Sequence, residues 1–285
     1  MTINQNIFGN KPPEAAELEP ETSTSKDLNL AAFSTAPDGV KTDINLELFG
    51  GGTAPSRKQP KDGLIKSWSP SSLKKFETCA YAAFLNYVKK IYQPGNEFTE
   101  RGTQIHQEAE DFVRGIGELT QNLMAFANQF HALRKAYEEG RVILEEEWGF
   151  DQNWNPTSWK DAWVRMKLDA LELESETSAV ITDYKTGKKD GNEVAHSSQG
   201  MIYAIGTFAK YPNLQYLRVN FWYLDQGQAM EKVYRRSEMA IFQPRVTARG
   251  MKMTTCTEFN PSPSRKNCMY CFYYDNGDCD YGTRI

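Results

Sequence analysis

The stretch "VITDYKTGKKDG", residues 180 to 191, is apolar at its start and rich in turn residues at its end. This pattern predicts a strand that runs into a turn. Side chains two residues apart in a strand point to the same face, so Asp183 and Lys185 would present a carboxylate and an ammonium group side by side. The run "WVRMKLDALEL", residues 163 to 173, predicts a second strand. If the two strands pair, Asp169 meets Asp183 at one end of a hairpin.

Helical and strand patterns surround this hairpin and predict a mixed α/β (α+β) core, a small sheet flanked by helices. Ser69 suits the N-cap of an opening helix and Pro70 its first position, with Cys79 on or just past that helix. Helical spacing and β-rich runs predict the other elements. They are helices at 98–117, 119–140 and 196–211, and strands at 141–150, 178–187 and 216–227.

The chain of 285 residues is 40% hydrophobic, which suits one sizeable domain with an appended segment. Residues 1–62 are rich in Pro, Gly, Ser, Thr and acidic residues, so we predict a disordered acidic tail before a folded domain at 63–285. No apolar run reaches the roughly 18 residues of a membrane span, and no secretory signal is readable. A cytoplasmic protein is therefore expected. The net charge of −4 does not by itself indicate a nucleic-acid-binding protein.

The predicted acidic cluster suits metal-dependent hydrolysis. Two carboxylates, Asp169 and Asp183, form a hard-oxygen site for Mg²⁺ or Mn²⁺, and an imidazole from His106 would bias it toward Mn²⁺. A metal in such a site lowers the pKa of a bound water molecule and neutralises charge on a phosphoryl group. Lys185 could orient the attacking water or stabilise the transition state. The chemistry that this predicts is phosphodiester hydrolysis.

Five segments resemble, in the same order, the RecB-type nucleases of the PD-(D/E)XK superfamily, which include CRISPR-associated exonucleases and the nuclease domains of bacterial recombination helicases. The resemblance covers residues 63–285. The segments are "SPSSLKKFETCAYAAFLNYV" (69–88), "RGTQIHQEAE" (101–110), "MKLDA" (166–170), "ITDYKTGK" (181–188) and "QGMIYA" (199–204).

The resemblance implies a role for each matching residue. The metal would be bound by His106, Asp169, Asp183 and the backbone carbonyl of Tyr184, and Lys185 would be catalytic. Gln199 and Tyr203 would face the site and help to hold the DNA or the lysine. Glu110 and Glu147 are further candidates, the latter because "LEEEW", residues 144–148, leaves the register of its glutamates ambiguous.

The same resemblance implies a DNA exonuclease that acts on single-stranded ends in recombination, repair or replication, with a helicase as a possible partner. Two other readings stay open at this point. One is a catalytically silent DNA-binding or scaffold subunit, although such a subunit has no need for Lys185. The other is an RNase or a structure-specific endonuclease, which would share all of the chemistry.

Five cysteines, an odd number, do not predict a disulfide framework in a reducing compartment. Cys268 and Cys271 form a C-x2-C pair and Cys279 follows, so three thiolates could converge on one metal centre with one ligand missing. By resemblance, Cys79 supplies the fourth ligand, because a subset of RecB-type nucleases holds a 4Fe-4S cluster in this way. Zinc remains the alternative, and unligated thiols are the third possibility. Cys256 is left over and is expected to be structural.

Two short apolar islands interrupt the predicted tail, "NIFGN" at 6–10 and "INLELFGG" at 44–51. Within the second, residues 45–49 resemble the short peptides with which bacterial replication proteins bind the sliding clamp, and Leu46, Leu48 and Phe49 could fill an apolar groove. Asn45 departs from the glutamine of that motif. The alternative is that both islands are inert.

Overall fold

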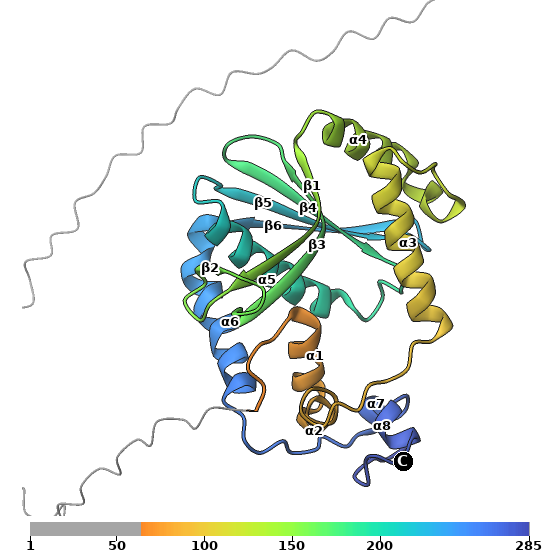
Figure 1. Ribbon diagram of the computed structural model, residues 1–285, viewed down its shortest axis with the longest axis vertical. Helices are drawn as coiled ribbons and strands as arrows, with labels where there is room; N and C mark the ends of the chain where they lie inside the picture. The colour runs from red at the N-terminus through yellow and green to blue at the C-terminus, as the bar shows by residue number, and fades with distance from the viewer. Residues whose placement is uncertain (1–63, 285) are drawn as a thin grey trace, which may run out of the picture. The chain divides into compact units, whose positions relative to one another are not determined.

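A six-stranded mixed sheet organises the part of the chain that the structure, a computed structural model, describes, residues 64–284 (Figure 1). All of these residues belong to one unit, Arg57–Ile285. The predicted tail, residues 1–62, and the clamp-like segment 45–49 lie outside the described residues. None of the helices between 64 and 284 is long and apolar enough to cross a membrane.

The strand order in the sheet is β2-β1-β3-β4-β5-β6. The predicted hairpin is confirmed, because β3 and β4 pair antiparallel with Ala170 opposite Thr182. The β4 and β5 strands are parallel, and α5 makes the crossover that a parallel pair requires. All other pairs are antiparallel. The strand bounds are β1 Val142–Phe150, β2 Pro156–Thr157, β3 Val164–Leu173, β4 Ser178–Lys185, β5 Tyr216–Tyr223 and β6 Gln228–Arg235.

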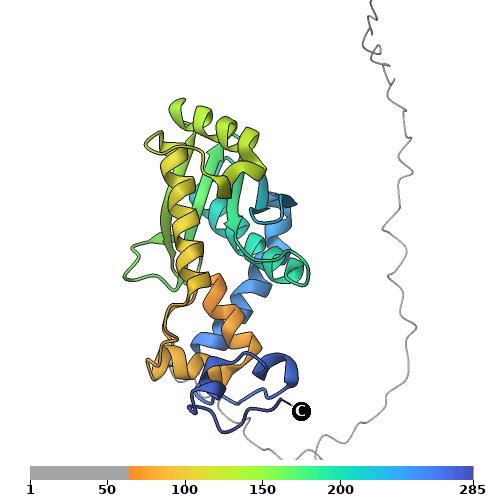
Figure 2. The same cartoon turned by 90° about the vertical axis from the view of Figure 1, so that its right-hand side faces the viewer.

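Helices cover both faces of the sheet, and each face has its own apolar core. On one face, α5 (Glu193–Lys210) packs with α1 (Pro70–Thr78) and α6 (Met239–Thr254) against the strands. On the other, α3 (Glu97–Arg114) and α4 (Ala127–Glu138) do so. Figure 2 shows α3 and α5 on opposite sides of the strands. This layering confirms the predicted fold class and places the ends of β3 and β4 between two helical layers.

The opening helix begins as predicted. The Ser69 hydroxyl accepts a hydrogen bond from the Ser72 N–H, and Pro70 occupies the first helical position. The helix ends at Thr78, and Cys79 has an extended backbone with φ −157°. Helical structure then resumes in α2 (Ala80–Ala83) and a π-helical turn, η1 (Phe84–Val88). Cys79 therefore lies at a break between two helices.

Several elements in the second half of the chain were not predicted from the sequence. Among them, β6 is an edge strand that is mostly exposed, so it lacks the apolar alternation that marks a half-buried strand. The α6 helix contains Pro244, which normally argues against a helix interior. Short elements complete the fold, namely η2 (Gln121–Phe126), η3 (Arg236–Glu238), α7 (Arg265–Cys268) and α8 (Phe272–Asp275).

Candidate active site

A local distortion of β1 sets the position of one acidic side chain. Glu145 has φ 53°, a left-handed conformation that costs a non-glycine residue roughly 1–3 kcal/mol. Leu144 packs in the core beside α3 and α4, whereas Trp148 packs in the core beside α5. Strict alternation would place these two side chains on the same face. The distortion at Glu145, opposite Asp169 of β3, therefore reverses the alternation: even-numbered side chains of β1 point to one helical layer before it and to the other layer after it.

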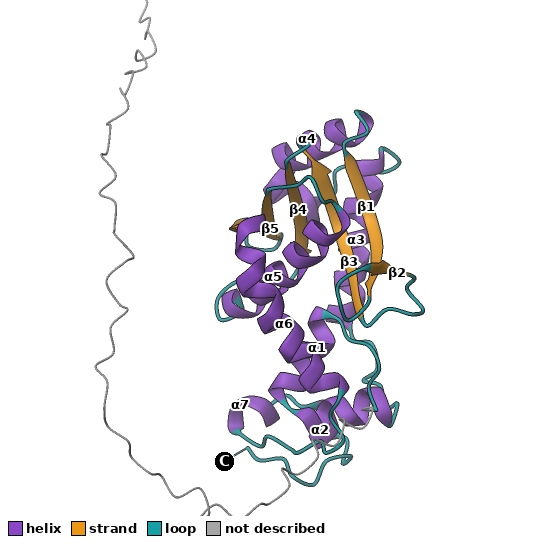
Figure 3. Ribbon diagram, turned by 90° about the vertical axis from the view of Figure 1, so that its left-hand side faces the viewer, coloured by secondary structure: helices purple, strands orange, loops and turns teal. Residues whose placement is uncertain are grey.

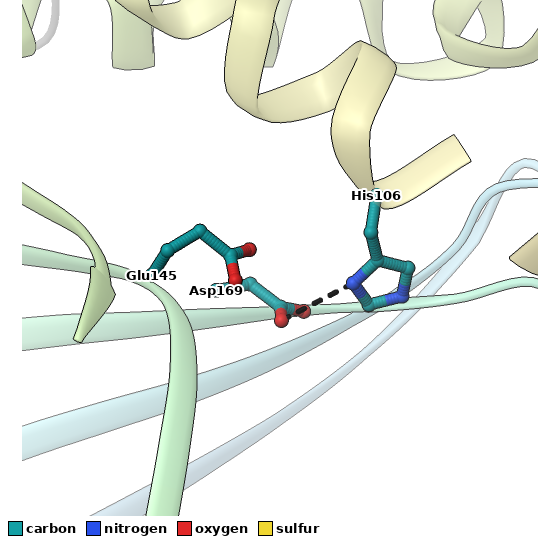
Figure 4. Close-up of side chains that lie close together, drawn as sticks. All are labelled: His106, Glu145 and Asp169. Carbon is teal, nitrogen blue, oxygen red and sulfur yellow. Dashed lines mark hydrogen bonds and ion pairs between the residues drawn. The ribbon is translucent and has the colours of Figure 1, made fainter. Parts of the chain in front are cut away.

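Three side chains from three elements form a candidate metal-binding group, His106 of α3, Glu145 of β1 and Asp169 of β3. One ligand atom of each lies within 4.8 Å of those of the others. Figure 4 shows the three side chains side by side. His106 Nδ1 is 3.2 Å from Asp169 Oδ1, and Asp169 Oδ2 accepts a hydrogen bond of 2.7 Å from the Tyr184 N–H. An imidazole and two carboxylates are suitable ligands for Mn²⁺ or Mg²⁺.

The carboxylates of this group control the charge on the imidazole. Burial opposes protonation of His106, but the hydrogen bond to Asp169 and the negative charges of Asp169 and Asp183 outweigh it, so the pKa of His106 is raised above its ordinary value. Glu145 is also paired with the ammonium group of Lys167, at 2.5 Å. The two carboxylates of the group therefore attract cations, either a proton on His106 or a metal ion.

The Asp183 and Lys185 side chains lie on the same face of β4, as the spacing predicts, and point toward α5. Lys185 Nζ is 2.5 Å from Asp183 Oδ2. Two α5 residues complete the network. Gln199 accepts a hydrogen bond of 3.1 Å from Lys185 and donates one of 2.9 Å to Asp183 Oδ1, and Tyr203 donates another of 2.9 Å to the same oxygen. These contacts fix the direction of the lysine side chain.

Burial governs the ionisation of this network. Asp183 is only 4% exposed, and burial raises its pKa while the charge of Lys185 opposes that shift. Burial and the Asp183 charge raise the pKa of Tyr203 well above its ordinary value. The phenol therefore keeps its proton at neutral pH and acts as a donor to Asp183.

All seven residues of the predicted site come together around the middle of β3 and the end of β4. They form two neighbouring groups rather than one, linked where the Tyr184 N–H, next to Asp183 in the chain, donates to Asp169. Asp183 contacts Lys185, Gln199 and Tyr203, and the structure places Glu145 with His106 and Asp169 instead. The seven residues are His106, Asp169, Asp183, Tyr184, Lys185, Gln199 and Tyr203.

Two further residues, Glu145 and His196, belong to the surroundings of the site, and neither was predicted from the sequence. Glu145 lies in the candidate metal-binding group, for which Glu147 and Glu110 were the further predicted candidates. Glu147 is exposed instead, and Glu110 pairs with Arg114. His196 lies one helical turn before Gln199, with its Nδ1 2.7 Å from the Tyr223 hydroxyl oxygen. Burial and nearby lysine charges lower the pKa of His196 to about 4, so it is neutral at pH 7.

Four cysteines line one cavity. The short helices around it, α2 and α7, lie at the opposite end of the molecule from α4 (Figures 1 and 3). The cavity has a volume of about 330 Å³, and Tyr81, Leu85 and Tyr273 are among its other lining residues. Burial raises the pKa of Cys279, and the charges of the other three thiols add to the shift. The four cysteines are Cys79, Cys268, Cys271 and Cys279.

The superfamily is shown by a comparison with known protein families. The family model of the PD-(D/E)XK nuclease superfamily matches residues 67–275, and the chain belongs to this superfamily. Membership implies metal-dependent nuclease activity. Among solved structures, the crystal structure of SSO0001 is similar, with 12% identity, 76% of this chain and 87% of that chain covered, and a TM-score of 0.43. No curated protein matched the chain.

Proposed function

We propose that this protein is a Mn²⁺- or Mg²⁺-dependent deoxyribonuclease that hydrolyses phosphodiester bonds, acting as an exonuclease on single-stranded DNA ends. The observation that carries the proposal is the placement of Lys185. Its ammonium group is held by Asp183 and Gln199, next to the candidate metal-binding group of His106, Glu145 and Asp169. A metal site can activate a water molecule, and a fixed cation beside it can stabilise the charge that develops on the phosphate.

Each residue has a distinct part in this proposal. His106, Glu145 and Asp169 would hold the metal, with Asp183 and the Tyr184 carbonyl as the further ligands that the resemblance implies. A bound divalent ion supplies a water of lowered pKa and charge neutralisation at the phosphate. The positive charge of Lys185 stabilises negative charge on the phosphoryl oxygens, or its ammonium group orients the attacking water. Gln199 and Tyr203 hold the side chains of Asp183 and Lys185 in fixed positions, so the ammonium group does not have to be ordered during the reaction.

A silent DNA-binding or scaffold subunit is the rival that keeps the same fold. Such a subunit gains nothing from a half-buried lysine that contacts both Asp183 and Gln199. Burying a charge costs free energy unless partners compensate for it. The compensated lysine therefore favours the enzyme.

We also propose that Cys79, Cys268, Cys271 and Cys279 hold a 4Fe-4S cluster. In a tetrahedral zinc site with Zn–S bonds of about 2.3 Å, the sulfur atoms lie roughly 3.8 Å apart. Among residues 64–284, however, the metal-ligand group with all ligand atoms within 4.8 Å is His106, Glu145 and Asp169, and no three thiols meet that limit. Wider sulfur spacing around a largely apolar cavity suits a cluster better than a single ion.

The decisive experiment for the nuclease proposal uses end-labelled 30-nucleotide substrates. The purified protein is incubated with single-stranded DNA, blunt duplex DNA and single-stranded RNA of the same sequence, with Mn²⁺, with Mg²⁺ and with EDTA. We expect metal-dependent release of short products from single-stranded DNA, and no reaction in EDTA. Cleavage of RNA alone, or internal cleavage of a circular single strand at the same rate, would replace the exonuclease assignment. No cleavage of any substrate would support the silent subunit.

A further inference from the structure

Two adjoining grooves lie at the start of β3, where the segment before α1 and the loop from β2 to β3 meet the sheet. Their volumes are about 300 Å³ and 380 Å³, and they share Lys66, Ser67 and Arg165. Figure 3 shows β2 and its loop at the end of the sheet nearer to α1. We name the two together the basic groove, after the four cationic side chains that line it, Lys66, Lys90, Lys160 and Arg165.

The groove carries an excess of positive charge, because its cationic side chains outnumber its acidic ones. Within residues 64–284, the side chains of Lys90, Lys160 and Arg165 form no ion pair with a carboxylate, whereas most arginines of this region do. The two acidic residues of the groove are committed to their own loop. Asp151 accepts from backbone N–H groups at 2.8 and 2.9 Å, and Asp161 accepts from a serine hydroxyl at 2.7 Å. The groove therefore suits an anion.

An exposed tryptophan lies beside these cations. Trp159 is 38% exposed, whereas the other five tryptophans of the chain are at most 8% exposed. The Arg165 guanidinium lies 5.3 Å from the Trp159 ring centroid and donates a hydrogen bond of 3.0 Å to the Trp159 carbonyl oxygen. An indole held in place by a guanidinium offers a stacking surface to a nucleobase, and only an unpaired base has its face available.

The β3 strand connects this groove to the candidate metal site. Arg165, Lys167 and Asp169 alternate along β3, so their side chains lie on one face, and the apolar residues between them are buried on the other. Four residues of strand span about 13 Å at roughly 3.3 Å per residue. That distance corresponds to about four stacked nucleotides at roughly 3.4 Å each. A DNA strand with its scissile phosphate at Asp169 can therefore reach Arg165.

We propose that the basic groove binds the single-stranded DNA that leads away from the active site. Trp159 stacks on one base, and Lys90, Lys160 and Arg165 contact the backbone phosphates. This proposal rests on the nuclease function proposed above and adds a binding site for the substrate outside the catalytic residues. It explains why Trp159, Lys90 and Lys160 are exposed and why Lys90, Lys160 and the half-buried Arg165 have no acidic partner among residues 64–284.

The test measures binding apart from cleavage. The full chain carrying Lys185→Ala is titrated against a 3′-labelled 12-nucleotide oligothymidylate without divalent ions, by fluorescence anisotropy. Adding Trp159→Ala should weaken binding roughly 5- to 100-fold, the range expected for one stacked base, and Trp159→Phe should retain most of the affinity. Adding Lys160→Ala should lower the slope of log K against log salt by about 0.7. Tyr216→Ala and Lys232→Ala, exposed residues of β5 and β6, are the matched controls and should change neither quantity.

The outcomes separate this proposal from the nuclease assignment. Unchanged affinity in Trp159→Ala together with an unchanged salt slope in Lys160→Ala would overturn the groove. An equal loss of affinity for a blunt 12-base-pair duplex would overturn its preference for single strands. In a separate reaction, the unmutated protein is given bis(p-nitrophenyl) phosphate, which is too small to reach the groove, and Mn²⁺. Failure to hydrolyse both this ester and DNA would overturn the nuclease function, and the binding measurements would still decide on the groove.

Discussion

Lys185 Nζ lies 2.5 Å from Asp183 Oδ2, while Gln199 bridges the two residues from the other side, accepting from the lysine and donating to the carboxylate. The cation is thus held by two elements, β4 and α5. Its direction is fixed before substrate binds, so the protein does not have to order the side chain during the reaction. Preorganised charge of this kind is effective in stabilising a transition state.

Replacing the lysine should therefore abolish cleavage without unfolding the protein. Lys185→Ala removes the fixed charge, and we expect a loss of rate on the order of 10²-fold or more in Mn²⁺-dependent cleavage of single-stranded DNA. Asp183→Ala should lower the rate at least as much, because it removes the ion-pair partner of Lys185 and the hydrogen-bond acceptor of Gln199 and Tyr203. Circular dichroism establishes that each variant is folded, and Lys232→Ala on the exposed edge strand serves as the control. Cleavage at the normal rate by folded Lys185→Ala would contradict the assignment.

Glu145 and Glu147 provide a matched pair for testing the metal site. Glu145 lies with His106 and Asp169, whereas Glu147 is exposed two residues further along β1. Glu145→Gln removes one anionic ligand, and we expect Mn²⁺ affinity, measured by isothermal titration, to fall at least about 10-fold, a typical loss for metal-site substitutions. Glu147→Gln should bind Mn²⁺ as the unmutated protein does. If the two variants gave the opposite result, Glu147 would regain its place as the candidate ligand.

The parts of the site that the sequence predicts are those set by local periodicity. Asp183 and Lys185 share a face because strand side chains repeat every two residues, and Gln199 meets Tyr203 because helix side chains four apart are neighbours. Glu145 could not be predicted in this way. Its position depends on a left-handed residue inside a strand, and nothing in three successive glutamates indicates which one adopts that conformation.

The fold shows the same division between local and tertiary information. The cap at Ser69 and Pro70 and the alternating strands β3 and β4 are local signals, and the structure confirms them. The β6 strand forms because β5 offers it a free edge, although its own side chains are mostly exposed. Likewise α6 tolerates Pro244 because its apolar side chains, including Val246 and Met253, are buried in the core beside α5. Tertiary packing overrides local preference in both cases.

As the pH is lowered, Mn²⁺ affinity should begin to fall at a higher pH than it would with a histidine of ordinary pKa. His106 must be neutral to bind a metal, and its pKa is raised above the ordinary value of about 6.5, with the bonded carboxylate of Asp169 outweighing burial. As pH falls through this raised pKa, a proton competes with Mn²⁺, so affinity should decline from a pH above about 6.5. Titration of Mn²⁺ affinity between about pH 5.5 and 8.5 tests this.

The control for the histidine prediction is His131, an exposed residue of α4. His131→Ala should retain the affinity and its pH dependence. His106→Ala should bind Mn²⁺ more weakly and should lose the part of the pH dependence that lies above about pH 6.5. An identical pH profile in His106→Ala and in the unmutated protein would show that another group titrates.

Four cysteines line the cavity between the first described helices and the C-terminal segment, and a cluster bound to them would join the two. Protein purified without oxygen should contain iron and absorb at about 400 nm, as iron-sulfur centres do. Ser in place of Cys79, Cys268, Cys271 or Cys279 should remove the absorption and most of the iron. Because metal binding contributes to folding free energy, each variant should also unfold at a lower temperature.

Cys256→Ser is the matched control for this series, because the Cys256 thiol donates to the Glu258 carbonyl oxygen and does not line the cavity. It should keep its iron and its unfolding temperature. Zinc without iron in the unmutated protein would decide for the zinc site, even though the thiols are spaced more widely than such a site needs. Full iron content in Cys79→Ser would remove that residue from the ligand set, and with it the direct link between the break after α1 and the C-terminal cysteines.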